Sequence, residues 1–218
     1  MDNFTTKLEK FFGGYKLRTY RRGDIILHEE DTPNGVYYIK NGVVKLYSYS
    51  PEGDELIRII LGPGDLFPIR WTLSQEPIDF YLEPMNQVDC WYAPRQDFLN
   101  LIRNDSELDL ALEDYIVKRM GTLYKRMEFF AFGDAYQKII SILVFLEKRF
   151  GKKEGDFIKI DVPITQSDLG ALVGMARETT NEELEKLKKQ GIIEWQEHHI
   201  IIKDLKKLCD NSPFITAV

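Results

Sequence analysis

The first hundred residues alternate short runs of β-type residues with turn residues. The runs are Ile25–Leu27, Gly35–Lys40, Val43–Ser48, Glu55–Leu61, Phe80–Pro84 and Gln87–Ala93. Gly, Asn, Asp and Pro separate them, as in Asn41-Gly42 and Pro63-Gly64-Asp65, and these residues favour tight turns because of the backbone conformations they adopt. Many short strands at regular spacing predict a closed β-sandwich or barrel.

After Pro94 the spacing of apolar residues becomes that of helices. Arg95–Arg103 predicts a short helix, and Ser106–Phe130 predicts a long one whose apolar residues recur every three or four positions. Such a stripe packs either against its own barrel or against the same helix of a second subunit, and we expect the dimer. The stripe starts at Leu108, and the expected dimer contacts are Leu112, Ile116, Met120, Leu123, Met127 and Phe130.

The long helix is predicted to end at Phe132-Gly133-Asp134. Gly133 supplies backbone freedom, and Asp134 supplies an N-cap oxygen for the next helix, Ala135–Phe150. This break is either a hinge between two domains or an ordinary turn between helices.

The segment from Ile164 to Leu184 predicts a helix-turn-helix. Thr165 can cap a first short helix, Gly170 permits close helix contact, and Gly174 suits a turn that needs a positive φ. Two strand-like runs, from Gly191 to Trp195 and from His199 to Ile202, follow around a polar turn. They add a wing to the motif.

Composition narrows the class of protein without naming a chemistry. The 218 residues are 44% hydrophobic and 29% charged, which is typical of globular proteins and allows two domains. We expect an intracellular, cytoplasmic protein, because the N-terminus does not read as a signal peptide and no run approaches a membrane span of about 18 apolar residues. Cys90 and Cys209 are expected to be free thiols, with no cofactor and no metal.

Charge argues mildly against a nucleic-acid partner. The net charge is −6, and the segment 151–218 holds ten Lys or Arg against twelve Asp or Glu, a local net of −2. Phosphate contacts need concentrated cations, so DNA affinity would depend on where each charge is placed and would be salt-sensitive.

The ordered motifs resemble the cyclic AMP receptor protein and fumarate–nitrate regulator family over essentially the whole chain. The resemblance is carried by Ala176-Arg177-Glu178-Thr179 and by a succession of barrel motifs. Those motifs are Arg22-Gly23-Asp24, Gly35-Val36-Tyr37-Tyr38-Ile39, Asn41-Gly42-Val43-Val44-Lys45-Leu46, Gly53-Asp54-Glu55 and Pro63-Gly64-Asp65-Leu66.

The resemblance implies an α+β protein in three parts. They are an effector-sensing β-barrel of the cyclic-nucleotide-binding type at 1–105, a dimerisation helix at 106–131 and a winged helix-turn-helix DNA-binding domain at 132–218. It also implies a transcription regulator and not an enzyme, working as a homodimer on an inverted repeat of double-stranded DNA, with RNA polymerase as a further expected partner.

In that family, residues matching Arg177 and Glu178 read base edges, and the chemistry agrees because Arg pairs with guanine and Glu accepts from cytosine. Thr179, Gln166 and Ser167 suit phosphate contacts. The sequence departs from the family at Asn181-Glu182, where many members carry a further Arg. The familiar half-site therefore does not carry over unchanged.

The barrel departs from the family more strongly. Cyclic-nucleotide binders hold the ribose with a Gly-Glu pair and the phosphate with an Arg followed by Ser or Thr, whereas this chain has Pro68-Ile69 and Ile78-Asp79-Phe80 near those positions. Because Asp79 would repel a phosphate, we expect an effector other than cyclic AMP. The candidate effector contacts are Arg70, Trp71, Tyr81 and Asp79.

Several alternatives stay open at this stage. Trp71 and Tyr81 can be plain barrel core, and Arg177 can be a solvated helix residue. The barrel can belong to a cupin-type metalloenzyme, although it offers only His28 as an imidazole ligand, or to a ligand-binding regulatory module that does not bind DNA. The sequence does not identify the effector, the promoters, or whether the outcome is activation or repression.

Overall fold

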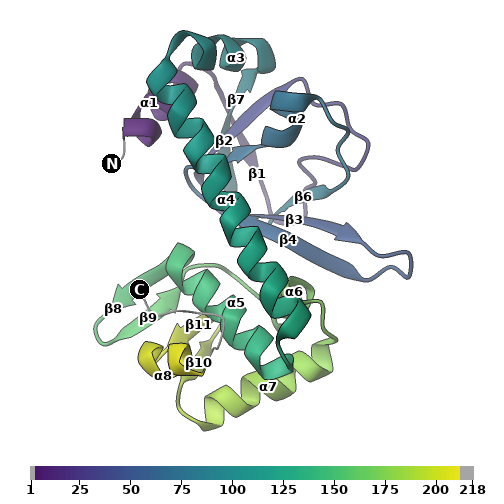
Figure 1. The fold of residues 1–218 in the computed structure, drawn as a ribbon, viewed down its shortest axis with the longest axis vertical. Coiled ribbons are helices and arrows are strands. Elements are labelled where there is room, and N and C mark those ends of the chain that lie inside the picture. The colour runs from purple at the N-terminus through teal and green to yellow at the C-terminus, as the bar shows by residue number, and fades with distance from the viewer. Residues whose placement is uncertain (1–2, 212–218) are drawn as a thin grey trace. The chain divides into compact units, whose positions relative to one another are not determined.

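A computed structural model describes residues 3–211 and divides the chain into two units. The first unit consists of the residues up to Ser48 together with Arg58–Met120. The second unit consists of Tyr49–Ile57 together with the residues from Gly121 onward. Figure 1 labels the elements along the chain, and each unit is described in turn.

The strands up to Pro94 pair into one sheet in the order β1-β7-β2-β5 and another in the order β4-β3-β6. Their bounds are β1 (Lys16–Tyr20), β2 (Gly35–Asn41), β3 (Val44–Tyr49), β4 (Glu55–Leu61), β5 (Leu66–Phe67), β6 (Tyr81–Pro84) and β7 (Val88–Pro94). The predicted succession of short antiparallel strands is confirmed for most runs. Ile25–Leu27 is the exception, since it forms only an isolated bridge from Leu27 to Leu82.

Three short helices also belong to this part of the first unit. They are α1 (Asn3–Phe12), α2 (Ile69–Ser74) and α3 (Arg95–Asn104). The prediction of a helix after Pro94 is confirmed, whereas α1, α2, β1 and β5 were not predicted. α2 and β5 are too short for a periodic signal, so only their packing in the folded chain defines them.

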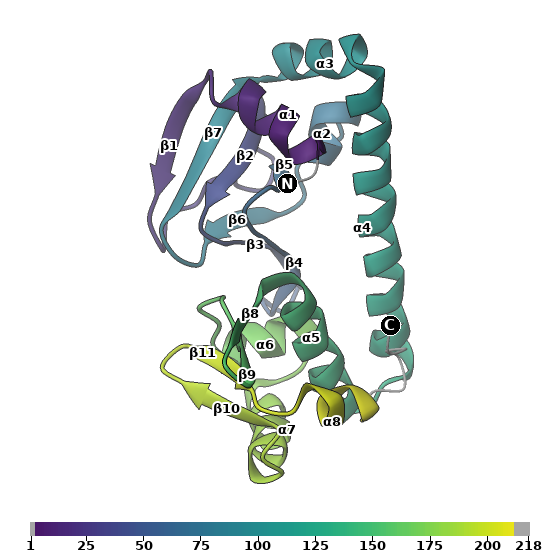
Figure 2. The same cartoon turned by 90° about the vertical axis from the view of Figure 1, so that its left-hand side faces the viewer.

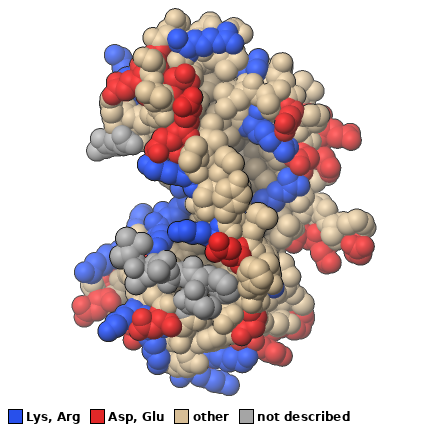
Figure 3. All heavy atoms as spheres, in the orientation of Figure 1, with Lys and Arg blue, Asp and Glu red and all other residues tan. Residues whose placement is uncertain are grey.

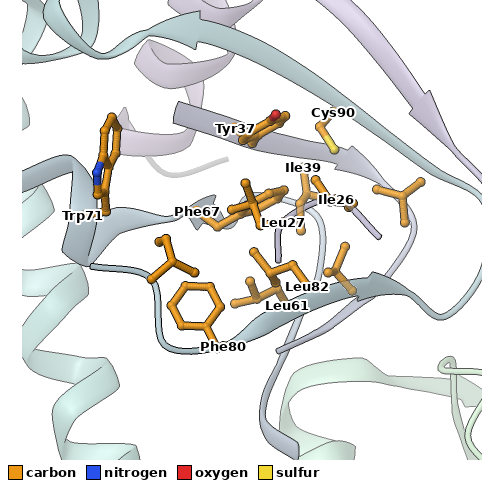
Figure 4. Packing of buried hydrophobic residues seen from close by; sticks show 13 residues of the cluster. Ile26, Leu27, Tyr37, Ile39, Leu61, Phe67, Trp71, Phe80, Leu82 and Cys90 are labelled. Atoms are coloured by element: carbon orange, nitrogen blue, oxygen red, sulfur yellow. The ribbon is translucent and has the colours of Figure 1, made fainter. Parts of the chain in front are cut away.

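The first unit contains two hydrophobic clusters. The interior between the sheets, shown in Figure 4, is filled by Ile39, Phe67, Leu82, Cys90 and their neighbours. Tyr37 and Phe67 stack there with ring centroids 4.8 Å apart. In the second cluster Leu8 and Phe12 of α1 pack with Phe98 of α3 and Tyr38 of β2. α1 and α3 are thereby fixed to the outside of the sheet.

α4 (Ser106–Phe132) is the long helix that the apolar spacing predicted, and it divides its apolar residues between two faces. Leu108 and Leu112 are fully buried in the cluster with α1 and α3, and Ile116 packs at its edge. A second set of apolar residues is exposed, from 45% at Met120 to 78% at Phe132. The sequence predicted a single apolar stripe on this helix. In the structure its apolar residues form one buried face and one exposed face.

The second unit begins its helical part with α5 (Ala135–Phe150), whose apolar face is buried. The expected N-cap is confirmed, because the Asp134 carboxylate accepts a hydrogen bond from the Gln137 backbone N–H at 2.8 Å. Strands pair in the order β10-β11-β9-β8, as Figure 2 shows from the side. The bounds are β8 (Gly151–Glu154), β9 (Phe157–Ile160), α6 (Gln166–Val173), α7 (Arg177–Lys189), β10 (Ile193–Gln196), β11 (His199–Ile202) and α8 (Leu205–Asp210).

The turn between α6 and α7 depends on two glycines. Gly174 caps α6 in the left-handed conformation, with φ 64° and ψ 43°. A Cβ on Gly170 would lie 2.8 Å from the Met175 carbonyl oxygen and 3.1 Å from the Thr180 hydroxyl, closer than side chains approach. Both glycines thus have the roles expected from the sequence, and they allow α6 and α7 to pack tightly.

Gly170→Ala is expected to lower the free energy of unfolding by about 1–3 kcal/mol, because the methyl group overpacks the α6–α7 contact. Gly121→Ala is the matched control, since Gly121 is also helical but its Cβ would meet nothing within 4 Å. That change is expected to stabilise α4 by about 0.5–1 kcal/mol. Urea denaturation measures both variants, and equal effects of the two substitutions would contradict the packing argument.

Candidate nucleic-acid interface and effector site

The helix-turn-helix is held in shape by its own capping interactions. Thr165 and Asp168 form a capping box, in which the Asp168 backbone N–H donates to the Thr165 hydroxyl and the Thr165 N–H donates to the Asp168 carboxylate. α7 begins after Ala176, and the Thr180 hydroxyl donates back to the Ala176 carbonyl at 2.9 Å. The start of α6 is therefore fixed by its capping box, whereas α7 begins after Ala176 without a side-chain cap.

The side chains predicted to contact DNA lie on an open surface of the second unit. Arg177, Glu178 and Glu182 are exposed on α7, and Thr179 and Asn181 are half-buried on the same helix. On α6, Ser167 is exposed and Gln166 is half-buried. Arg177 and Glu178 in the first turn of α7 are therefore accessible to solvent within this unit, whereas Thr180 is buried.

A shallow pocket of about 220 Å³ brings part of this set together. Gln166, Ser167 and Arg177 line it, with Thr165, Trp195 and His198. Trp195 belongs to β10 and His198 lies in the turn before β11, so the wing completes a surface that the sequence assigned to the helices alone. The polar composition of the wing turn was the signal that could have indicated His198.

Two of the three lysines of α7 have carboxylate partners. Lys186 pairs with Glu183 at 2.8 Å and Lys188 pairs with Glu185 at 2.7 Å. Figure 3 accordingly shows basic and acidic side chains interspersed over the surface that α7 forms. This arrangement agrees with the local negative charge, and it leaves few cations to attract phosphate nonspecifically.

Arg126 is a structural residue of the second unit that the sequence did not indicate. It is 5% exposed, and its guanidinium donates to the carbonyl of Leu172 in α6 at 2.9 Å and to that of Ile57 at 3.3 Å. Burial lowers the pKa of Arg126 to about 10. The end of α4 is thus hydrogen-bonded directly to the first helix of the helix-turn-helix.

The predicted dimer contacts separate into two groups. Leu112 is buried within its own unit and Ile116 is half-buried there, so Leu112 has no surface for a partner. Met120, Leu123 and Met127 are exposed, and Phe130 is half-buried beside Phe129. Leu112 is therefore removed from the dimer face considered below.

Five of the exposed apolar residues of α4 follow a seven-residue repeat, whereas Leu123 and Phe132 lie outside it. Leu110, Val117 and Tyr124 are spaced by seven, and Met120 and Met127 each come three residues after one of them. This is the a and d spacing of a two-stranded coiled coil. The sequence contains this repeat. The exposure of each side chain was needed to distinguish the repeat from the apolar residues of α4 that pack within the first unit.

In the first unit the predicted effector residues Arg70 and Asp79 form an ion pair. Arg70 also approaches Glu76 at 3.5 Å, and Arg58 of β4, which the sequence did not indicate, donates to the other oxygen of Asp79 at 3.1 Å. Burial opposes ionisation of Asp79, but the hydrogen bond and charge of Arg58 and the charge of Arg70 outweigh it, so its pKa is lowered.

The two aromatic candidates occupy different environments. Trp71 is 8% exposed and belongs to the interior cluster, with the Arg95 guanidinium 5.7 Å from its ring centroid. Tyr81 is half-buried and stacks on Tyr47 with centroids 5.4 Å apart. Figure 4 shows Trp71 set apart from the main group of interior side chains.

Asp65 links the β-strands to α4 within the first unit. Its carboxylate is 3% exposed, accepts from the Gly62 N–H at 2.8 Å and pairs with Arg119 of α4. The Tyr115 hydroxyl lies 3.3 Å from the same carboxylate. The turn motif Pro63-Gly64-Asp65 therefore also holds the long helix in place.

The described part of the chain contains two cysteines and other side chains of the types that can bind a metal ion. Among residues 3–211 no three His, Cys, Asp or Glu side chains are grouped to hold a metal ion. Cys90 and Cys209 are free, as expected, and burial raises the pKa of Cys90 to about 12. Of the helices described, none has the length and apolar content to cross a membrane.

Two family models match the chain. Residues 17–105 match the cyclic nucleotide-binding domain, and residues 137–210 match the Crp-like helix-turn-helix domain. The two matches lie on the described barrel and on the winged helix-turn-helix.

Curated relatives cover most of the chain at low identity. The CRP-like cAMP-activated global transcriptional regulator of Mycobacterium tuberculosis is 25% identical over 189 residues, covering 87% of this chain and 84% of its own length. The cyclic AMP receptor protein of Thermus thermophilus is 23% identical over 180 residues, covering 82% and 80%.

Solved structures share the fold. FixK2 from Bradyrhizobium japonicum superimposes with a TM-score of 0.79 at 19% identity, covering 94% of this chain and 99% of that one. A mutant of CooA from Carboxydothermus hydrogenoformans superimposes with a TM-score of 0.78 at 21% identity, covering 96% of both chains. With both family models matched in order, the chain belongs to the Crp/Fnr family of DNA-binding transcription regulators, which are not enzymes.

Proposed function

We propose that the protein reads an inverted repeat in double-stranded DNA by placing the first turn of α7 in the major groove. The observation that carries this proposal is the exposed pair Arg177 and Glu178 in the first turn of α7, the second helix of the helix-turn-helix. Arg donates two parallel hydrogen bonds to guanine, and Glu accepts from the amino group of cytosine. Gln166 and Ser167 at the start of α6 are suited to phosphate contacts, which fix the register.

The wing contributes to the same surface in this proposal. His198 and Trp195 line one pocket with Arg177, so a phosphate seated there would meet a guanidinium, an imidazole and the polar ends of α6. Because the nearby lysines are paired with carboxylates, affinity depends on these few groups and on having two copies of them. A dimer is thus required for tight binding.

The dimer is proposed to form through the exposed face of α4. In a parallel coiled coil, Val117, Met120, Tyr124 and Met127 meet the same residues of a second chain. Crp/Fnr regulators bind DNA as dimers, and the apolar side chains exposed on this helix are those that a dimer would cover. Of the contacts expected from the sequence, Met120 and Met127 lie in this repeat, and Leu123 is exposed beside it.

The effector is proposed to act on the barrel near α2 and β6, where Arg70, Trp71, Tyr81 and Asp79 lie. Because Arg70 is paired with Asp79, a neutral planar or apolar ligand suits the aromatic residues better than an anion suits Arg70. The protein is proposed to act in the cytoplasm, where chromosomal DNA lies, with RNA polymerase as the partner through which bound DNA is transcribed.

The dimer face can be tested by charging it. Val117→Glu together with Tyr124→Glu is expected to give monomers in sedimentation, because the coiled coil would bury like charges. Lys125→Glu is the control, since it places a carboxylate on the same helix outside the seven-residue repeat. A double variant that sediments as an unaltered dimer would place the interface elsewhere.

Base reading can be tested by selecting binding sites from random DNA. Arg177→Ala is expected to flatten the preference at one guanine in each half-site, a loss of about 1–3 kcal/mol of discrimination. Glu182→Arg is expected to tighten binding and shift a preferred base. Lys189→Ala, an exposed cation at the other end of α7, serves as control and should weaken all sequences alike.

The half-sites are expected to lie about 34 Å apart, one helical turn, since two symmetric helices enter successive major grooves. An unchanged consensus in both Arg177→Ala and Glu182→Arg would show that α7 does not read the bases.

Cyclic AMP is expected not to bind measurably in calorimetry at micromolar concentrations. Its phosphate would have to displace Asp79 from Arg70 and Arg58 and would be repelled by the same carboxylate. The M. tuberculosis relative, which is named as cAMP-activated, provides the positive control. Micromolar affinity of this chain for cyclic AMP would contradict the assignment.

A further inference from the structure

Two arginines from separate elements converge on the carboxylate of Asp79. Arg58 of β4 donates to one carboxylate oxygen at 3.1 Å and to the Asp79 carbonyl at 2.9 Å. Its Nε donates to the Ser48 hydroxyl at 3.1 Å, which orients the guanidinium. Arg70 of α2 donates to the second carboxylate oxygen and to the Pro77 carbonyl at 3.3 Å. Every oxygen of Asp79 is thereby held.

This arrangement has the composition of an anion-binding site. Planar guanidinium groups bind carboxylate and phosphate oxygens through paired donors, and two of them converging on one anion is the usual way to bind a phosphate. Here the anion is a side chain of the protein. Since Arg58 is held by Ser48 as well as by Asp79, its position does not depend on the carboxylate alone.

The site is accessible from solvent. The side chains of Arg58, Arg70 and Asp79 are 37%, 47% and 49% exposed, so a small anion could reach the two arginines if the carboxylate were absent. Glu76, which approaches Arg70 at 3.5 Å from the side, balances part of the charge. A free anion would therefore have to compete with a carboxylate tethered at the site, which has a large advantage in effective concentration.

We propose that Arg58 and Arg70 form an anion site whose resident anion is Asp79, so that the chain itself fastens the α2–β6 segment to β4 and excludes external phosphate. The domain thus supplies internally the contact that a phosphate-bearing ligand would otherwise make. Removing the Asp79 carboxylate opens a site for inorganic phosphate. The proposal concerns the proposed effector region but does not depend on DNA binding.

The test measures the thermal midpoint of the full-length protein in phosphate and in chloride at equal ionic strength. Wild type is expected to show only the small, non-saturating gain that phosphate gives a folded protein over chloride, with no saturable component. Asp79→Ala is expected to have a lower midpoint in chloride and to gain about 2–4 °C or more in phosphate, with saturation, because phosphate binds only the folded form. Asp79→Ala combined with Arg58→Gln is expected to lose that gain.

Two further variants make the result decisive. Glu76→Ala removes a carboxylate from the same arginine but leaves Asp79 in place, so it should respond to phosphate as wild type does. Asp79→Asn keeps the shape of the side chain without its charge and replaces Asp79→Ala if the smaller side chain prevents folding.

The proposal is overturned if neither Asp79 variant gains stability from phosphate, which would make the cluster an ordinary surface ion pair. It is also overturned if wild type shows a saturable gain, or if Glu76→Ala gains as much as Asp79→Ala. Since the readout is stability and not DNA binding, its failure leaves the proposed DNA-binding function unaffected.

Discussion

The structure depends on α4 having apolar residues on two faces. One face is occupied within the first unit by Leu108, Leu112 and the buried pair of Asp65 with Arg119. The other face exposes Val117, Tyr124 and Met127 to solvent. Among the described residues the chain covers only the first of these faces, and we propose that a second copy covers the other.

Charges in the protein are compensated close to where they occur. Asp79 is held by two arginines, and Lys186 and Lys188 of α7 are held by their own glutamates. The pairing of these charges has the same consequence for phosphate binding in both units. An external phosphate, whether of a nucleotide or of DNA, meets few free cations, and recognition must come from individual groups such as Arg177 rather than from a general positive field.

Much of the second unit could be predicted from local chemistry. Gly170, Gly174, Thr165 and Asp134 indicated helix ends and a close helix contact, and each depends on the backbone conformation or donor of a near neighbour in sequence. The helices at Arg95 and Ala135 and most strands were likewise predictable from periodicity. The ordered motifs then identified the family.

The sequence by itself therefore determined most of the elements and their order, the helix-turn-helix and the absence of the nucleotide-binding residues. It did not indicate α1, α2, β1, β5, β8, β9 or α8. Only the tertiary structure decided which apolar face of α4 is buried and that Arg58 and Arg70 both bind Asp79. It also decided that Arg126 donates a hydrogen bond to α6, and that Trp195 and His198 line a pocket with Arg177. These contacts join residues far apart in the chain, and periodicity and turn chemistry describe only neighbours. Their partners are set by how the strands and helices pack together.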